Sequence, residues 1–215
     1  MDAFTQLTAK ACSIPVAHVD TDQLIPARFM KESRSVGYGQ FLLYDLRYSA
    51  DGSVKPDFPL NSSAADEARI MVTRRNFGAG SSREAAVYAL VDAGYRCVIA
   101  PSFGDIFSSN AVNNGLLPAV VSEADCESLL ITLASDIQPV TVNLNDMSIR
   151  CGDLCIKFVI NSIWRTKLLN GWDDIDLTQA HREEIDQFQE HYLQKYAWSV
   201  SNLLTKTKNV DVKHI

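Results

Sequence analysis

The sequence predicts an α/β fold, and three observations support this prediction. From residue 69 to about residue 145 the chain alternates strand-like and helix-like runs, a pattern typical of a parallel sheet with crossover helices. Hydrophobic residues make up 47% of the chain, which indicates a globular protein rather than a disordered one. Its 215 residues are enough for one substantial core. We therefore expect a single large domain.

The predicted elements of the middle region follow one another in order. Short apolar runs predict strands at 70–73, 96–100, 116–121 and 140–144. Helices are expected between them, at 82–93, 105–113 and 123–134. Ser122 and Asp125 form a capping-box pattern that would start the last of these helices.

The N-terminal region predicts strands followed by a capped turn. Residues 9–19 have the composition of one or two strands. Asp20, Thr21 and Asp22 then supply caps for a helical turn over 23–25.

A long connection at 31–61 follows, rich in glycine, proline and aromatic residues. A connection of this length is unusual in a compact domain unless it is mobile or functional. Arg47 lies in it with aromatic neighbours. On the sequence alone, Arg47 either closes over an anionic substrate or is a surface arginine without a role.

The C-terminal third predicts a hairpin and then a polar helix. Apolar runs at 147–151 and 154–158 flank Gly152-Asp153, a turn pair, and the hairpin would point Cys151 and Cys155 apart or into packing. A polar helical stretch is expected over 178–198. These features predict one domain over 1–199 with a helical C-terminal extension, and a polar tail at 200–215.

Charge and composition argue against several functions. The formal net charge is −6 and no basic stripe occurs, so nothing favours nucleic-acid binding. The N-terminus has no signal-peptide pattern and no run of about 18 apolar residues occurs. We expect a soluble, cytoplasmic protein without membrane contact. The five cysteines lack Cys-x-x-Cys spacing and the four histidines are scattered, so the sequence predicts neither a disulfide framework nor a metal site.

The segment 76–84, Asn-Phe-Gly-Ala-Gly-Ser-Ser-Arg-Glu, carries the clearest chemical signal. It connects a predicted strand to a predicted helix, and its glycines allow a tight turn. Such a turn leaves backbone N–H groups at a helix start, where the helix dipole favours an anion. Arg83 adds a fork of donors suited to a carboxylate or a phosphate, and Ser81 would place its hydroxyl in that field.

Two other interpretations of this segment compete. Ser81 and Glu84 fit a capping box, in which Ser81 only starts a helix, and on local pattern this weighs as much as a chemical role. Gly78-x-Gly80 resembles the first half of a dinucleotide fingerprint, but Arg83 stands at the third glycine position and no Gly-Lys-Ser/Thr follows. Both nucleotide motifs therefore fail at defining positions.

Six segments together resemble the small subunit of 3-isopropylmalate dehydratase, in the aconitase superfamily. They occur in the family's order and span most of residues 7 to 190; they are 19–26, 57–61, 76–84, 98–107, 114–118 and 169–171. The resemblance implies a swivelling β/β/α three-layer domain, as in the aconitase C-terminal domain. It also implies a heterodimer with a large subunit that carries a 4Fe-4S cluster, and no cofactor in this chain.

The resemblance further implies a reaction and its residues. The enzyme would convert 2-isopropylmalate to 3-isopropylmalate by dehydration and rehydration, in leucine biosynthesis. Ser81 would be the catalytic base that removes a proton from carbon. Ser82 and Arg83 would bind the dicarboxylate substrate, and Arg47 would belong to the substrate-recognition segment.

The sequence departs from the family pattern at two positions. Where the family reads Gly-Cys-Gly-Ser-Ser-Arg-Glu-His, Ala79 replaces the cysteine and Ala85 replaces the histidine. The first change is expected only to repack the turn, and the second removes a polar group near Ser81. Two other hypotheses stay open: a related hydro-lyase subunit of the methylmalate/citraconate or homoaconitate type, and a non-catalytic binding domain of the same fold.

Overall fold

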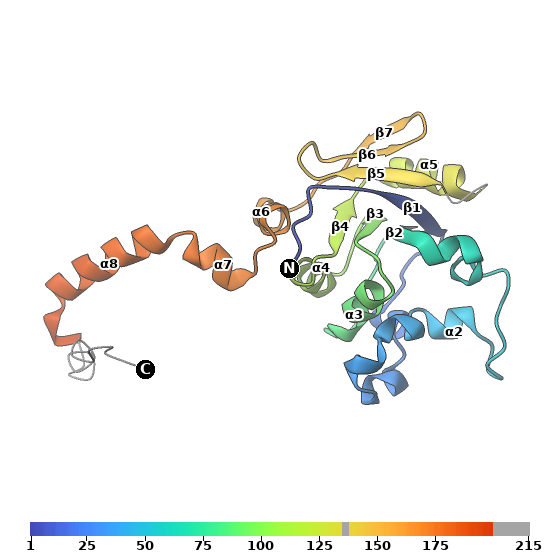
Figure 1. The fold of residues 1–215 in the computed structure, drawn as a ribbon, viewed down its shortest axis with the longest axis horizontal. Coiled ribbons are helices and arrows are strands. Elements are labelled where there is room, and N and C mark those ends of the chain that lie inside the picture. Colours follow the sequence, from blue (N-terminus) through green and yellow to red (C-terminus); the bar gives the residue numbers. More distant parts are fainter. Residues whose placement is uncertain (135–137, 200–215) are drawn as a thin grey trace, which may run out of the picture. The chain divides into compact units, whose positions relative to one another are not determined.

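The computed structural model describes residues 1–134 and 138–199 (Figure 1). The chain divides into two compact units, Met1–Asp173 and a second unit that begins at Asp174. The predicted domain limits of 1–199 stay a prediction, and the predicted tail at 200–215 lies outside the described residues.

The first unit is built on a seven-stranded sheet with the order β4-β3-β2-β1-β5-β6-β7. Its strands are β1 Gln6–Ile14, β2 Ala68–Thr73, β3 Cys97–Ala100, β4 Leu117–Val120, β5 Pro139–Asn143, β6 Ser148–Cys151 and β7 Leu154–Lys157. Strands β1 to β4 are parallel, whereas β5, β6 and β7 are antiparallel. The sheet is therefore mixed.

The expectation that the strand at 140–144 continues the parallel sheet is wrong. The chain enters the sheet where the Ala11 N–H donates to the Gln138 carbonyl at 3.1 Å, and from there β5 runs antiparallel to β1, from Lys10 back to Gln6. The side chains of β5 also alternate between buried and partly exposed, whereas all four residues of β3 are buried. Alternation of this kind is typical of an antiparallel strand with one covered face.

The sheet curls until its two edges meet. The Val120 N–H donates to the Val159 carbonyl at 3.2 Å, and the Val159 N–H donates to the Val120 carbonyl at 2.8 Å. Val120 ends β4 at one edge, and Val159 follows β7 at the other. The antiparallel strands and α5 (Glu123–Ala134) thereby enclose one buried cluster with the parallel strands. A second cluster covers the opposite face under the N-terminal helices, and the three-layer β/β/α fold is confirmed.

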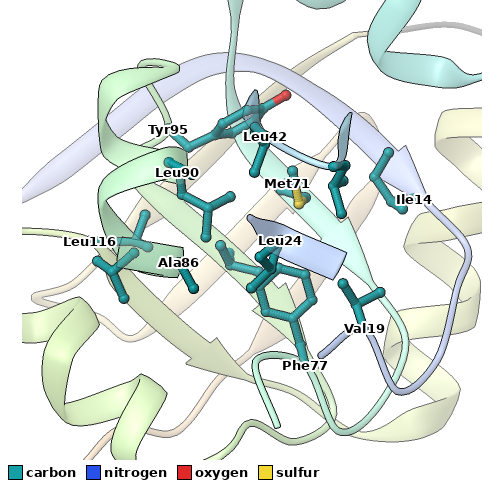
Figure 2. Packing of buried hydrophobic residues seen from close by; sticks show 14 of the residues in the cluster. Ile14, Val19, Leu24, Leu42, Met71, Phe77, Ala86, Leu90, Tyr95 and Leu116 are labelled. Carbon is teal, nitrogen blue, oxygen red and sulfur yellow. The ribbon is translucent and has the colours of Figure 1, made fainter. Parts of the chain in front are cut away.

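The second cluster lies between the sheet, α1 (Thr21–Leu24) and α3 (Ala85–Asp92), as Figure 2 shows. Leu24, Met71, Phe77 and Leu90 are fully buried in it. Full burial of a large aliphatic or aromatic side chain is worth about 1.5–3 kcal/mol each. This packing holds α1 and α3 against the strands from which the functional loops emerge.

The connection after α1 folds into short helical turns. These are Ala27–Lys31, Arg34–Val36, Tyr38–Phe41, α2 Tyr44–Arg47, Pro59–Asn61 and Ser63–Glu67. Leu43 donates its N–H to the Leu24 carbonyl at 3.0 Å, and Tyr38 donates its N–H to the Asp92 carboxylate at 3.0 Å. Both side chains are buried, so this connection is part of the core.

The remaining helices of the first unit are α4 Asp105–Asn113 and α6 Ser162–Asn170. The predictions for α4 and α5 are confirmed to the residue. At the start of α5, the Asp125 N–H donates to Ser122 Oγ at 3.0 Å, as the capping pattern predicts. The predicted hairpin is also confirmed: Cys151 is buried and Cys155 is exposed on β6 and β7.

The second unit contains α7 Asp174–Gln179, α8 Arg182–Lys195 and the turn Ala197–Ser199. Neither helix has a buried residue. The predicted polar helix at 178–198 is thus present as α8, with a break after α7. Across the described residues, no helix combines the length and the apolar composition needed to cross a bilayer.

Candidate functional site

Three loops meet where the parallel strands β1, β2 and β3 end. They are the segments that follow each strand, 15–20, 74–84 and 101–104. Because parallel strands point the same way, their carboxyl ends lie at the same end of the sheet, which is where ligands bind in open α/β sheets. The loop 76–84, predicted to be functional, lies at this end.

Backbone hydrogen bonds join the middle loop to its two neighbours. The Gly78 N–H donates to the Val19 carbonyl at 2.7 Å, and the Phe77 N–H donates to the Ser102 carbonyl at 3.1 Å. The Gly104 N–H returns to the Phe77 carbonyl at 2.9 Å. The loop thus extends the sheet pairing by one residue on each side, with bridges at Asp20–Ala79 and Phe77–Phe103.

Glycine is required where these loops press together. A Cβ on Gly78 would lie 2.5 Å from Cδ2 and 2.8 Å from Cβ of Phe107, and a Cβ on Gly104 would lie 2.6 Å from the Gly78 carbonyl oxygen. Phe107 itself packs edge-on against Phe77, with 5.3 Å between ring centroids, and stacks with Phe103 at 6.2 Å. The turn therefore rests on an aromatic cluster that has no room for another carbon.

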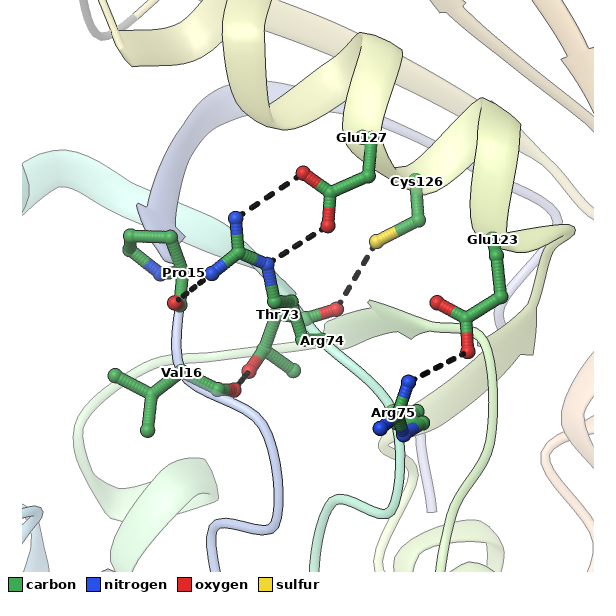
Figure 3. Close-up of polar contacts among 8 residues, drawn as sticks. All are labelled: Pro15, Val16, Thr73, Arg74, Arg75, Glu123, Cys126 and Glu127. Atoms are coloured by element: carbon green, nitrogen blue, oxygen red, sulfur yellow. Dashed lines mark hydrogen bonds and ion pairs between the residues drawn. The ribbon is translucent and has the colours of Figure 1, made fainter.

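Polar contacts between β2 and α5 fix the base of the middle loop (Figure 3). Arg74 donates Nε to Glu127 at 2.7 Å and Nη2 to the same carboxylate at 3.1 Å, and its Nη1 donates to the Pro15 carbonyl at 2.8 Å. The Thr73 hydroxyl donates to the Val16 carbonyl at 3.0 Å. Arg74 thereby ties the ends of β1 and β2 to α5.

Ser81 lies on the exposed side of this loop, beside α1. Its Oγ is 3.3 Å from Oγ1 of Thr21, and its carbonyl accepts a hydrogen bond from the same Thr21 hydroxyl at 3.2 Å. The Thr21 N–H also donates to the Ala79 carbonyl at 2.9 Å. Ser81 is exposed whereas Thr21 is buried, so one side of the serine hydroxyl is held and the other faces out.

The capping-box interpretation of Ser81 is wrong. Helix α3 begins at Ala85, its N-cap is Glu84, and no side chain caps it. Residues 81–83 form a turn instead, in which the Arg83 N–H donates to the Ser81 carbonyl at 2.8 Å. The Glu84 carboxylate accepts from Asn114 at 2.8 Å rather than from the N-cap backbone. The turn uses the residues that a cap would need, so the helix predicted from 82 starts later.

Several donors around Ser81 stay available. Within the described part of the chain, no hydrogen bond uses the backbone N–H groups of Ser81, Ser82 and Glu84. Ser82 is exposed. These donors precede a helix whose N-terminal end carries partial positive charge, so the loop offers an anion both N–H groups and a favourable field.

Arg83 is paired with Asp22, the second residue of α1. Its Nη1 contacts the Asp22 carboxylate, and the side chains are 29% and 57% exposed respectively. Among the described residues, Nε and Nη2 of Arg83 have no hydrogen-bond partner. A carboxylate ligand can therefore take the free edge of the guanidinium while Asp22 holds the other.

The sequence does not predict that Thr21 and Asp22 contact Ser81 and Arg83, because the local pattern indicates only caps of a helical turn. That turn is confirmed: Asp20 is the N-cap, its carboxylate accepts from the Gln23 N–H at 2.7 Å, and Gln23 reaches back to the Asp20 N–H at 3.0 Å. The signal that could have found them is their position in the helical turn that follows the loop after β1, the strand that pairs with β2.

Arg47 does not join Ser81 and Arg83. Its Nε donates to the Asn61 side chain at 2.9 Å and its Nη1 approaches the Leu42 carbonyl at 3.5 Å. It lines a cavity of about 230 Å³ whose wall contains Tyr95 and no residue of the 76–84 loop. In this structure Arg47 braces the connection between α2 and residue 61.

The described residues contain no group of three or more His, Cys, Asp or Glu side chains placed to hold a metal ion. Burial raises the pKa of the Cys12 thiol to about 12 and that of Cys126 to about 11, and it raises the pKa of Cys97 and Cys151 as well. Ligation of iron requires thiolates. The cysteines in the described part of the chain are thus not gathered into the ligand set that a 4Fe-4S cluster needs.

Comparisons with known proteins identify the family. The sequence pattern of the aconitase C-terminal domain matches residues 1–124. The 3-isopropylmalate dehydratase small subunit of Rhizobium etli is 42% identical over 201 residues, covering 93% of this chain and 100% of the relative. That of Granulibacter bethesdensis is 45% identical over 200 residues, covering 92% of this chain and 96% of the relative.

A solved structure has the same fold. The crystal structure of 3-isopropylmalate dehydratase from Methanocaldococcus jannaschii aligns with a TM-score of 0.61 at 24% identity, covering 86% of this chain and 99% of that one. Structural similarity at 24% sequence identity shows the fold alone. Family membership therefore rests on the two relatives above, which are 42% and 45% identical to this chain. The chain belongs to the aconitase C-terminal domain family, among the small subunits of 3-isopropylmalate dehydratase.

Proposed function

We propose that this chain is the small subunit of a 3-isopropylmalate dehydratase and acts in the cytoplasm with a large subunit. The complex interconverts 2-isopropylmalate and 3-isopropylmalate by dehydration and rehydration, a step of leucine biosynthesis. Family membership across nearly the whole chain supports this proposal. The complex is a hydro-lyase, and this chain contributes half of its active site.

The large subunit carries the 4Fe-4S cluster in this proposal. The described residues of this chain contain no group of three or more His, Cys, Asp or Glu side chains placed to hold a metal ion, and a cluster of this kind needs such a set of ligands. We therefore derive only what this chain's own residues do.

One observation carries the proposal: the exposed Ser81 hydroxyl lies two residues from a half-buried guanidinium, on a loop braced from both sides. Ser81 in its alkoxide form removes a proton from a substrate carbon. The carbon–hydrogen bond breaks, an oxygen–hydrogen bond forms on Ser81, and the electron pair stays on carbon. Serine is a poor base at neutral pH, so its anion must be stabilised, and the free N–H groups and Arg83 supply that field.

Arg83 and Ser82 bind a substrate carboxylate. The free Nε and Nη2 edge of Arg83 matches the two oxygens of a carboxylate, and Asp22 fixes the orientation of the guanidinium. Ser82 adds an exposed hydroxyl and a backbone N–H beside it.

Substrate contact by Arg47 stays a prediction. Its Nε bond to Asn61 assigns it first to bracing the connection. Arg47→Lys keeps the charge but loses the fork of donors. If Arg47 contacts substrate, this change raises KM, and if it only braces the connection, the change lowers stability with KM unchanged.

Reconstitution tests the function. The full chain is mixed with a cluster-bearing large subunit, and turnover of 2-isopropylmalate is followed by the ultraviolet absorption of the unsaturated intermediate. The wild type should be active and Ser81→Ala should lose nearly all activity, while Ser128→Ala on α5 serves as the matched serine control and retains it.

Undiminished activity of Ser81→Ala would reject Ser81 as the base, and an inactive wild type would reject the function. Equal turnover of citrate or methylmalate would point to the related hydro-lyase subunit instead.

A further inference from the structure

The Thr21 hydroxyl is a buried polar group whose hydrogen bonds both go to Ser81. Thr21 is 2% exposed. Its Oγ1 lies 3.2 Å from the Ser81 carbonyl oxygen and 3.3 Å from Ser81 Oγ, and no other partner occurs among the described residues. The Ala79 carbonyl, which accepts from the Thr21 N–H at 2.9 Å, holds the threonine backbone against the same loop. Thr21 is therefore fixed to the segment that carries the proposed base.

Counting protons determines how these two bonds can be made. A threonine hydroxyl has one proton to donate, and a carbonyl oxygen can only accept. When Ser81 is neutral, Thr21 donates to the Ser81 carbonyl and accepts from the Ser81 hydroxyl. When Ser81 is an alkoxide, it has no proton to give, and the Thr21 proton can turn to it instead.

We propose that Thr21 is a positioning residue that selectively stabilises the alkoxide form of Ser81 by switching its single proton from the Ser81 carbonyl to Ser81 Oγ. A hydrogen bond to an anionic acceptor is roughly twice as strong as one between neutral groups. The bond therefore favours the charged form of Ser81 and lowers the pKa of its hydroxyl. Thr21 keeps its proton throughout and forms no covalent bond.

This inference rests on the proposed role of Ser81 as the base. In the neutral state it also predicts that the Ser81 proton points towards Thr21, which leaves the lone pairs on the exposed side. An oxygen prepared in this way is aimed at a substrate carbon before the substrate binds.

The first test measures the anion preference without substrate or partner. Ser81→Cys is made in the full chain in a Cys155→Ser background, since the other four cysteines are buried. The pKa of the introduced thiol is obtained from the pH dependence of its alkylation by iodoacetamide, followed by mass spectrometry. Adding Thr21→Val, which replaces the hydroxyl with a methyl group, should raise that pKa by about one unit, and Thr21→Ser should restore it.

Thr73→Val is the matched control. Thr73 is equally buried and its hydroxyl also donates to a backbone carbonyl, that of Val16, yet it does not contact Ser81. This change should leave the thiol pKa unaltered.

All these changes leave the titratable groups of α1 and of the segments that meet here unaltered; these groups are His18, Asp20, Asp22, Arg74, Arg75, Arg83 and Glu84. If Thr21→Val does not fold, Thr21→Ala takes its place.

The second test uses the reconstituted complex with its cluster-bearing partner. Thr21→Val should lower kcat roughly tenfold to hundredfold, the worth of one charge-assisted hydrogen bond, with KM nearly unchanged. The acidic limb of the pH profile should move to higher pH, because a base with a raised pKa is deprotonated later. Thr21→Ser should recover most of the kcat.

An unchanged thiol pKa in Thr21→Val, or the same shift in Thr73→Val, overturns the proposal. A raised KM with an unchanged kcat in Thr21→Val also overturns it. The two proposals can fail separately. If the thiol pKa depends on Thr21 but the reconstituted complex does not turn over isopropylmalate, the proposed function is rejected and the effect of Thr21 on Ser81 stands.

Discussion

Replacing Gly78 by alanine should damage both stability and activity, because the loop has no room for one more carbon. Gly78 has φ +71°, and its added Cβ would meet Phe107 at 2.5 Å and 2.8 Å. Phe107 is 3% exposed and packs between Phe77 and Phe103, so its ring has no free space into which to move.

The magnitude follows from two separate costs. A left-handed backbone costs a residue with a Cβ about 1–2 kcal/mol, and overpacking a filled site costs about 1–3 kcal/mol more. The free energy of unfolding should therefore fall by about 2–5 kcal/mol. Gly52 is the matched control, since its φ is +83° but nothing lies within 4 Å of an added Cβ. Gly52→Ala should carry only the backbone cost.

Urea denaturation of the two variants measures this difference directly. In the reconstituted complex, a shift of the Ser81 loop by about 1 Å should lower kcat on the order of a hundredfold, and Gly52→Ala should be near wild type. Equal stability losses in Gly78→Ala and Gly52→Ala would refute the argument that Phe107 leaves no room at Gly78.

Three further predictions follow from named contacts. Asp22→Asn should lower stability by less than about 1 kcal/mol, since its pair with Arg83 is partly exposed. The same change should lower kcat/KM about tenfold, because it frees the guanidinium of Arg83. A stability loss with full activity would contradict this prediction. The hydrogen bond from Arg74 lowers the pKa of Glu127, so the stability this pair contributes is present above the unfolded pKa near 4.5 and is lost as pH falls through the folded value. Urea titrations of wild type and Glu127→Gln should therefore converge at low pH, and a gap that persists below pH ~3 would count against the assignment. At pH ~8, iodoacetamide should modify Cys155 alone among the native cysteines of the folded chain, as read by mass spectrometry, because the other four thiols are buried.

Local pattern was sufficient for most of the secondary structure. Helices α4 and α5 began and ended where apolar periodicity, caps and glycine stops placed them, because those signals act within a few residues. The direction of β5 was not local information. Its pairing depends on where Gln138 enters the sheet beside Ala11, a contact between residues that lie far apart in the sequence.

The sequence by itself determined the fold family, the composition of the 76–84 loop and the identity of the serine and the arginine within it. The tertiary structure decided what those residues contact. Ser81 contacts Thr21 and does not cap α3, Arg83 pairs with Asp22, and Arg47 donates a hydrogen bond to Asn61. The reason is physical: these partners lie on α1 and on a separate connection, and only the parallel pairing of β1 with β2 brings α1 to the loop.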